Sequence, residues 1–325
     1  MTTTIQILAG FALLILGGEI LVRNAVAVAT RMKVSPLLIG LTLVGFGTST
    51  PELVTSLEAA LQAAPGLAVG NVIGSNVANI LLILGLAATV APIKTNTKGF
   101  RRDASFLIVS AILASLAIAY GEIGRLTGAA LLGTLGVYLV RTYQMECDTP
   151  VAQPSAPQPA AAGRADQTPT GTAHRLPTSV YAALAAAGIA LTIFGADLLV
   201  TGATTLARSF GVSETVIGLT LVAVGTSLPE MVTSVLAALR KQGDIAVGNI
   251  IGSNIYNILG ILGVTSLITP IPIPQDIGAD DIGMLIAATV ALIWLGLGGW
   301  RIQRREGGVL LGVYVLYVTL LGAAA

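Results

Sequence analysis

Long apolar stretches, separated by short polar segments, run through most of the chain. Each approaches the length of about 20 mostly apolar residues that an α-helix needs to cross a bilayer. The stretches are 5–25, 36–62, 68–92, 103–120, 124–144, 179–200, 214–239, 245–270, 281–299 and 307–324. Between the fifth and the sixth, residues 146–178 contain few large apolar side chains. The pattern predicts an all-α membrane protein of about ten transmembrane helices, five on each side of this interruption.

Composition supports a chain that lies in the lipid bilayer. Hydrophobic residues make up 54% of the sequence and charged residues 10%, whereas soluble domains carry about 25% charged residues. The net charge of +1 gives no reason to expect nucleic acid as a partner, and nothing implies a protein partner. The first apolar stretch lacks a basic leader and a clear cleavage site, so we expect a retained helix rather than a signal peptide.

The chain contains an internal repeat with an offset of 178 residues. Residues 40–85 and 218–263 align without a gap and are identical at 30 of 46 positions. Both copies contain Gly-Thr-Ser-x-Pro-Glu, at 47–52 and 225–230, followed by Gly-Ser-Asn-x-x-Asn, at 74–79 and 252–257. Each copy places a glutamate, Glu52 or Glu230, in an apolar stretch, where an ionisable residue indicates a functional site. Their symmetry predicts one cation site between two repeats.

Basic residues predict the orientation in the membrane. With ten spans and the N-terminus outside, 15 of the 17 basic residues lie on one side, and Arg125 and Arg208 are the exceptions. The positive side is cytoplasmic, so both termini are expected outside. Five helices per repeat is an odd number, so the second repeat must be inverted. The predicted division is a first repeat at 1–145, a flexible cytoplasmic linker at 146–178 and a second repeat at 179–325.

The flanks of the repeat agree with the inversion. Gln62 aligns with Arg240, and Lys98 aligns with Asp276. Equivalent positions thus exchange basic for non-basic residues as they change sides. We expect the membrane to be the inner (cytoplasmic) membrane of a prokaryote.

Both motifs predict broken helices. Pro51 and Pro229 supply no N–H and clash with the carbonyl four residues earlier, which belongs to Gly47 and Gly225 respectively. Freed carbonyls at membrane depth are tolerated where they line a cavity or are buried in protein. They are also ready ligands for hard cations.

The side chains of the motifs form an all-oxygen set. The carboxylates are Glu52 and Glu230, the hydroxyls are Thr48, Ser49, Ser75, Thr226, Ser227 and Ser253, and the amides are Asn79 and Asn257. Calcium favours six to eight oxygen ligands in flexible geometry. Zinc and copper are poor candidates because the single cysteine and the single histidine lie outside the motifs. Two carboxylates balance one divalent or two monovalent cations, which permits exchange by competition.

These paired motifs resemble the two alpha repeats of the sodium/calcium exchanger family, within the calcium/cation antiporter superfamily. The resemblance covers nearly all ten stretches. It implies antiport of calcium against sodium by alternating access, with no cofactor and with Ca²⁺ and Na⁺ as the bound ions. Carried over by position, it implies as ligands the ten side chains above and the carbonyls of Gly45 and Ala223. Some relatives, notably potassium-dependent ones, carry aspartate at the position of Asn257, so potassium co-transport is not expected.

Other function classes remain open from the residues alone. Glutamates carry protons, so a proton/calcium antiporter is the first alternative. A passive cation channel is less favoured, because inverted repeats with broken helices are typical of transporters. An intramembrane hydrolase would need a base to activate a serine, and no lysine or histidine is expected at membrane depth. We therefore expect a protein that is not an enzyme.

Several other repeated polar residues allow structural interpretations. Asn71 and Asn249 are interpreted as residues that cap or start helices. Asn76 and Asn254 are equally consistent with hydrogen bonding between helices. Glu19 could pair with Arg23 one turn later.

Overall fold

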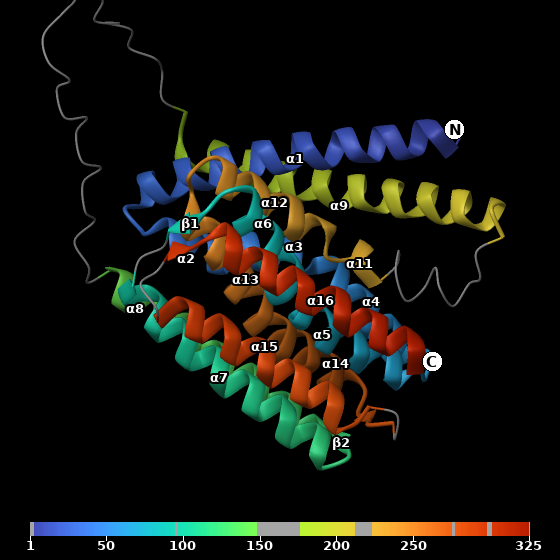
Figure 1. The fold of residues 1–325 in the computed structure, drawn as a ribbon. Helices are drawn as coiled ribbons and strands as arrows, with labels where there is room; N and C mark the ends of the chain where they lie inside the picture. Colours follow the sequence, from blue (N-terminus) through green and yellow to red (C-terminus); the bar gives the residue numbers. More distant parts are fainter. Residues whose placement is uncertain are drawn as a thin grey trace, which may run out of the picture.

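The structure is a computed structural model, and it describes residues 3–94, 97–147, 176–211, 223–274, 277–297 and 301–324. The chain is a bundle of helices (Figure 1). Unbroken helices are α1 (Thr3–Met32), α7 (Thr97–Ala119), α8 (Arg125–Cys147), α9 (Thr178–Ser209), α15 (Ala279–Leu297) and α16 (Arg304–Ala324). Each predicted apolar stretch coincides with a helical segment, although the start of 214–239 and most of the linker lie outside the described residues. By length and composition, six helical segments among the described residues could cross a membrane: Thr3–Met32, Pro65–Val90, Phe100–Ala119, Thr178–Ser209, Gly243–Ile268 and Ala279–Gly296. The number is seven if one bent pair of helices is counted as a single span.

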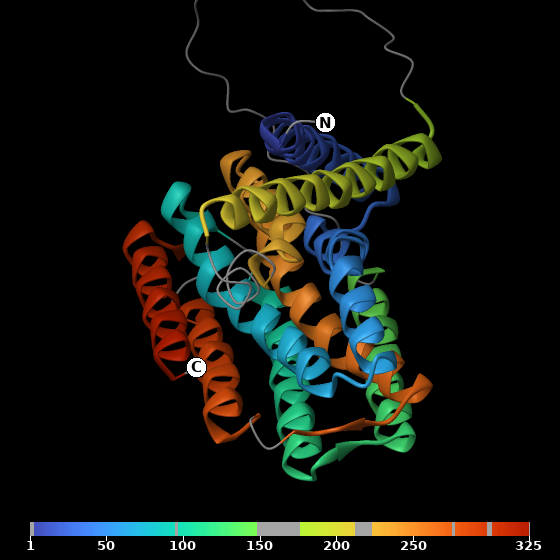
Figure 2. The ribbon, with the colours of Figure 1, turned by 90° about the vertical axis from the view of Figure 1, so that its right-hand side faces the viewer.

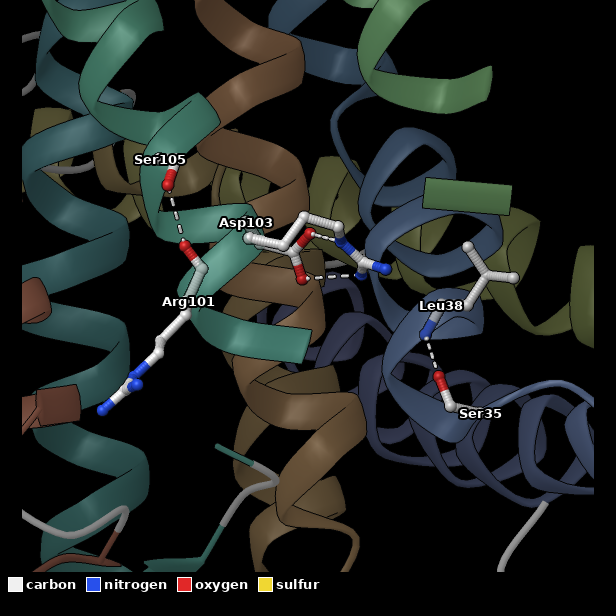
Figure 3. A network of polar contacts seen from close by, with 6 residues as sticks. Ser35, Leu38, Arg101, Asp103 and Ser105 are labelled. Atoms are coloured by element: carbon white, nitrogen blue, oxygen red, sulfur yellow. Dashed lines mark hydrogen bonds and ion pairs between the residues drawn. The ribbon is translucent and has the colours of Figure 1, made fainter. Parts of the chain in front are cut away.

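The bent pair is the helix that carries the first motif. It consists of α2 (Pro36–Ile39), the π-helix η1 (Gly40–Val44), α3 (Gly45–Thr48) and α4 (Thr50–Leu61), with a bend of 44° before α4. Ser35 caps α2 by accepting a hydrogen bond from the Leu38 N–H at 3.1 Å (Figure 3). Pro51 lies in the first turn of α4, where a missing N–H removes no helical hydrogen bond. The predicted break at the motif is therefore confirmed in the first repeat.

The second motif has the same construction where it is described. α11 (Ala223–Gly225) is followed by α12 (Leu228–Leu239), with Pro229 in the first turn of α12. The next helix of each repeat contains a π-helical segment. These helices are α5 (Pro65–Ala78), η2 (Asn79–Leu84) and α6 (Gly85–Val90), and α13 (Gly243–Ile255), η4 (Tyr256–Leu262) and α14 (Gly263–Ile268). π-Helical turns occur frequently at functional sites, and these coincide with Asn79 and Asn257.

Two short antiparallel strand pairs join the repeats. β1 (Ile93–Lys94), before α7, pairs with β4 (Arg301–Ile302), after α15. β2 (Glu122–Ile123), after α7, pairs with β3 (Ile271–Pro272), before α15. The start of α7 therefore lies near the end of α15, and the end of α7 near the start of α15. These helices occupy equivalent places in the two repeats and run antiparallel, as an inverted duplication requires.

α1 and α9 form a separate pair on one face of the other helices (Figure 2). They pack along each other at glycine positions. A Cβ added at Gly17 would lie 2.7 Å from the Thr192 backbone nitrogen, and one added at Gly188 would lie 2.6 Å from that of Leu21. At one end of the pair, the Arg31 guanidinium lies 5.4 Å from the centre of the Tyr181 ring. Small residues that permit such close approach are typical of helix packing in membranes.

Two ion pairs join charged side chains outside the motifs. Asp103 on α7 is fully buried and forms an ion pair with Arg102 at 2.7 Å (Figure 3). Glu19 on α1 forms an ion pair with Arg240, directly after α12. The prediction that Glu19 pairs with Arg23 is therefore wrong, because α12 crosses α1 at this point and offers a basic partner from the other repeat.

The strand pairs provide a direct test of orientation. In a Cys147→Ala background, which lacks the only cysteine, we expect Tyr120→Cys to be labelled from outside alone. Tyr120 is 85% exposed beside β2. Gln303→Cys, exposed beside β4, should be labelled only from the cytoplasm. The measurement is reaction with an impermeant maleimide in intact cells and in inverted vesicles. Labelling of both positions from one side would contradict the predicted orientation.

Candidate cation site

Glu52 and Glu230 occupy matching positions at the two helix breaks. Each lies in the first turn of its helix, α4 or α12, and each residue is 1% exposed. The positive end of the helix dipole favours a carboxylate there. No described lysine, arginine or histidine forms an ion pair with either glutamate. Two carboxylates are thus held inside the protein without a basic partner.

Hydrogen bonds cross between the repeats at this point. The Ser49 hydroxyl donates to Glu230 Oε1 at 2.8 Å, and the Ser227 hydroxyl donates to Glu52 Oε1 at 3.0 Å. The serine that precedes each break therefore binds the glutamate that follows the other break. This exchange brings the two motifs together into one site. The Oε2 atom of each glutamate is buried and makes no hydrogen bond.

The threonines of the motifs differ in their contacts. The Thr48 hydroxyl lies 3.0 Å from the Val44 carbonyl oxygen and 3.2 Å from Asn249 Oδ1. The Thr226 hydroxyl is buried and has no hydrogen-bond partner. The two repeats therefore differ in the contacts of this hydroxyl.

The remaining predicted ligands lie on the helices around the glutamates. Ser253 donates to the Gly45 carbonyl at 3.2 Å, across the repeats. Ser75 is buried on α5. Ala223 is the first residue of α11. The Gly47 carbonyl, expected to be free, accepts a hydrogen bond from the Thr50 hydroxyl at 2.9 Å.

Asn79 and Asn257 are both buried at the π-helical segments. Asn79 donates through Nδ2 to Asn254 Oδ1 at 2.9 Å, and its own Oδ1 is free. Neither the oxygen nor the nitrogen of the Asn257 amide has a partner. Asn254 also donates to the Asn76 carbonyl at 3.4 Å. This hydrogen bond joins α13 to α5, in agreement with the interpretation that Asn254 forms hydrogen bonds between helices.

Sequence reasoning missed how Asn71 and Asn249 act. Both lie in the interior of their helices, α5 and α13, so the prediction that they cap or start helices is wrong. Asn71 donates to the Glu52 carbonyl at 3.1 Å and to the Ser56 hydroxyl at 2.8 Å. Asn249 donates to the Glu230 carbonyl at 3.3 Å and to the Ser234 hydroxyl at 2.9 Å. We call each set an asparagine clamp; its only sequence signal is that all its members repeat.

The unpaired oxygens define what the site can do. Among the residues that the structure describes, no group of three or more His, Cys, Asp or Glu residues could hold a metal ion. The site instead combines two carboxylates with neutral oxygens. Among the predicted ligands, the buried side-chain oxygens without a partner are Glu52 Oε2, Glu230 Oε2, Asn79 Oδ1, Asn257 Oδ1 and Thr226 Oγ1. Leaving a buried polar group unsatisfied costs about 1–3 kcal/mol, and a hard cation bound by these oxygens would remove that cost.

Comparison with known proteins identifies a family and several relatives. The profile of the family described as "Sodium/calcium exchanger protein" matches residues 2–144 and 180–323. The chain is 38% identical to "Putative antiporter CaxA" of Alkalimonas amylolytica, over 99% of both sequences. It is 33% identical to "Sodium/calcium exchanger MaX1" of Methanosarcina acetivorans, over 97% of both.

A solved structure supports the same assignment. The sodium-calcium exchanger NCX_Mj, soaked with Na⁺ and Ca²⁺, aligns with a TM-score of 0.79 and 31% sequence identity. The alignment covers 98% of this chain and 99% of that one. The match extends over both repeats, including the helices that carry the two glutamates. The chain therefore belongs to the sodium/calcium exchanger family.

Proposed function

We propose that this protein exchanges Ca²⁺ for Na⁺ across a membrane by alternating access, with both ions bound between the repeats. The observation that carries the proposal is the pair of crossed bonds from Ser49 to Glu230 and from Ser227 to Glu52. Each bond joins a break in one repeat to the carboxylate of the other. A change in the relative position of the repeats therefore changes the site itself.

The charge of the site supports competition between the two ions. Glu52 and Glu230 together carry two negative charges, which balance one Ca²⁺ or two Na⁺. Screening by water is weak at buried positions, so charge balance dominates the affinity. One kind of ion must leave before the other binds, which couples the two fluxes.

We propose as ligands all twelve residues that the sequence predicts. The carboxylates of Glu52 and Glu230 are the central ones. The neutral ligands are the hydroxyls of Thr48, Ser49, Ser75, Thr226, Ser227 and Ser253, the amides of Asn79 and Asn257, and the carbonyls of Gly45 and Ala223. The free oxygens of Glu52, Glu230, Asn79, Asn257 and Thr226 support this set. The hydroxyls that donate to carboxylates keep lone pairs for a cation.

The placement in the cell is part of the proposal. We place the protein in the inner membrane of a prokaryote, with both termini outside and the linker 146–178 in the cytoplasm. The asymmetry of the basic residues supports this orientation. In this orientation β1 and β4, which carry Lys94 and Arg301, lie at the cytoplasmic surface.

Measurements of calcium uptake under different ion gradients test which ion drives the exchange. In proteoliposomes, calcium uptake should require internal sodium and should respond to an imposed membrane potential. The reason is that exchange of more than two Na⁺ for one Ca²⁺ moves net charge. The measurement is radioactive calcium uptake against sodium, proton and choline gradients. Uptake driven equally well by protons would favour the proton/calcium antiporter, and uptake that needs no counter-ion would favour a channel.

The shared site is tested by single charge removal. Glu52→Gln and Glu230→Gln should each lower calcium uptake more than about a hundredfold. Two unit charges 4 Å apart interact by about 4 kcal/mol at the effective dielectric of a protein site, and a divalent ion doubles this attraction to a carboxylate. Glu58→Gln, on α4 but outside the site, is the matched control and should transport normally. Transport retained in either site variant, in correctly inserted protein, would reject the shared site.

The neutrality of Asn257 predicts the response to potassium. Calcium flux at fixed sodium should not change when potassium replaces choline, because the site has no third carboxylate. Asn257→Asp adds a charge within the same site and should introduce a dependence on potassium. The measurement is initial uptake over a potassium series, with Asn76→Asp as a control at a neighbouring amide. A strong potassium requirement in the unmodified protein would contradict the proposed ligand set.

A further inference from the structure

Glu19 on α1 and Asp197 on α9 occupy equivalent positions in the two repeats. They are 178 residues apart, as are Gly17 and Gly195 on the same helices. Both acids lie in helices that are long and apolar enough to cross a membrane. An ionisable residue in such a helix indicates a functional site. Neither acid belongs to the proposed ligand set, so the two form a second symmetric pair of carboxylates with no role assigned to it.

Glu19 is neutralised by an ion pair. Arg240 directly follows α12, and its guanidinium donates to both carboxylate oxygens of Glu19, with Nε 2.7 Å from Oε2. The neighbouring Gly18 packs against α12, since a Cβ added there would lie 2.8 Å from Leu236 Cδ1. Arg240 therefore cancels the charge of Glu19 on the side that the proposed orientation places toward the cytoplasm.

Asp197 has no equivalent partner. The position that matches Arg240 is Gln62, directly after α4, and it is neutral. Asp197 is exposed, and it forms no ion pair with a residue that the structure describes. Arg208 on the same helix is 11 positions further on, which corresponds to about 16 Å along the helix axis. The segment 212–222, outside the described residues, contains no basic residue.

Asp197 lies close to the second motif. Val200, one turn further along α9, packs against Gly225, because a Cβ added to Gly225 would lie 2.4 Å from Val200 Cγ2. Gly225 begins the Gly-Thr-Ser-x-Pro-Glu motif that ends at Glu230. An exposed carboxylate without a basic partner thus lies one helical turn from the contact between α9 and this motif. Because the second repeat is inverted, this side is the outer one in the proposed orientation.

We propose that Asp197 attracts cations to the site from the outer side, and that Arg240 abolishes the equivalent attraction by Glu19 on the cytoplasmic side. The role rests on the proposed function, because it concerns the approach to the proposed cation site. Ca²⁺ carries twice the charge of Na⁺, so the Asp197 carboxylate attracts Ca²⁺ more strongly than Na⁺. Two repeats with matching ligands therefore take up calcium more readily from one side of the membrane.

The test compares the KM for calcium on the two sides of the membrane. Asp197→Asn removes the charge with little change in volume. It should raise the outer KM by between about twofold and tenfold at low ionic strength and should leave the cytoplasmic KM unchanged. The measurement is radioactive calcium uptake at a fixed sodium gradient in right-side-out and in inverted vesicles. In about 1 M choline chloride the effect should disappear, because the Debye length falls to about 3 Å.

Reciprocal variants follow from the repeat. Gln62→Arg gives the outer side the residue type that Arg240 provides on the other side. It should raise the outer KM as Asp197→Asn does, and it should have a smaller effect in the Asp197→Asn background. Arg240→Gln leaves Glu19 without its partner and should lower the cytoplasmic KM. Adding Glu19→Gln to Arg240→Gln should cancel that gain.

A matched control separates this role from a general effect of surface charge. Glu122 is an exposed carboxylate on β2, on the same outer side but on a different element, so Glu122→Gln should leave both KM values unchanged. An unchanged outer KM in Asp197→Asn, an equal rise on both sides, or a rise that persists in about 1 M choline chloride would overturn the role of Asp197 and leave the exchange itself intact. Absence of sodium-driven calcium uptake in the unmodified protein would reject the proposed function and this role with it.

Discussion

Two buried carboxylates without a basic partner are the constraint on which the rest of the structure depends. An ionised group in a membrane-spanning protein is costly, and here that cost is offset by local donors and helix ends. Each glutamate lies in the first turn of the helix that follows a break, so the charge is placed at the positive end of a helix. Each glutamate also accepts a hydrogen bond from a serine hydroxyl of the opposite repeat. The breaks, the repeat and the crossed contacts follow from placing two negative charges at one point inside the protein.

The Asn71 and Asn249 clamps support the site in the same way in both repeats. Asn71 donates to the Glu52 carbonyl and Asn249 donates to the Glu230 carbonyl. The backbone of each glutamate is therefore held by a neighbouring helix of its own repeat, while its side chain is bound by a serine of the other repeat.

The helices and their breaks could be predicted from the sequence because they depend on local pattern. Apolar length located the helices, and the proline after each Gly-Thr-Ser located the breaks. The same logic failed for Asn71 and Asn249, because asparagine is unfavourable inside an isolated helix and a cap was the expected alternative. A neighbouring helix supplies the partners instead. The Glu19–Arg240 pair and the crossed serine bonds join residues about two hundred positions apart, so only the packing of the helices reveals them.

The strand pairs at the ends of α7 and α15 have a consequence for how such a chain could arise. β1 meets β4, and β2 meets β3, through backbone groups that do not depend on side-chain identity. Both joints connect the same parts of a repeat: the strand after the third helix and the strand before the fifth. The crossed serine bonds and the α1–α9 contact likewise lie outside 148–175. Two separate copies of one ancestral half, inserted in opposite directions, could make all of these contacts. The contacts that join the two halves thus do not require the halves to be one chain.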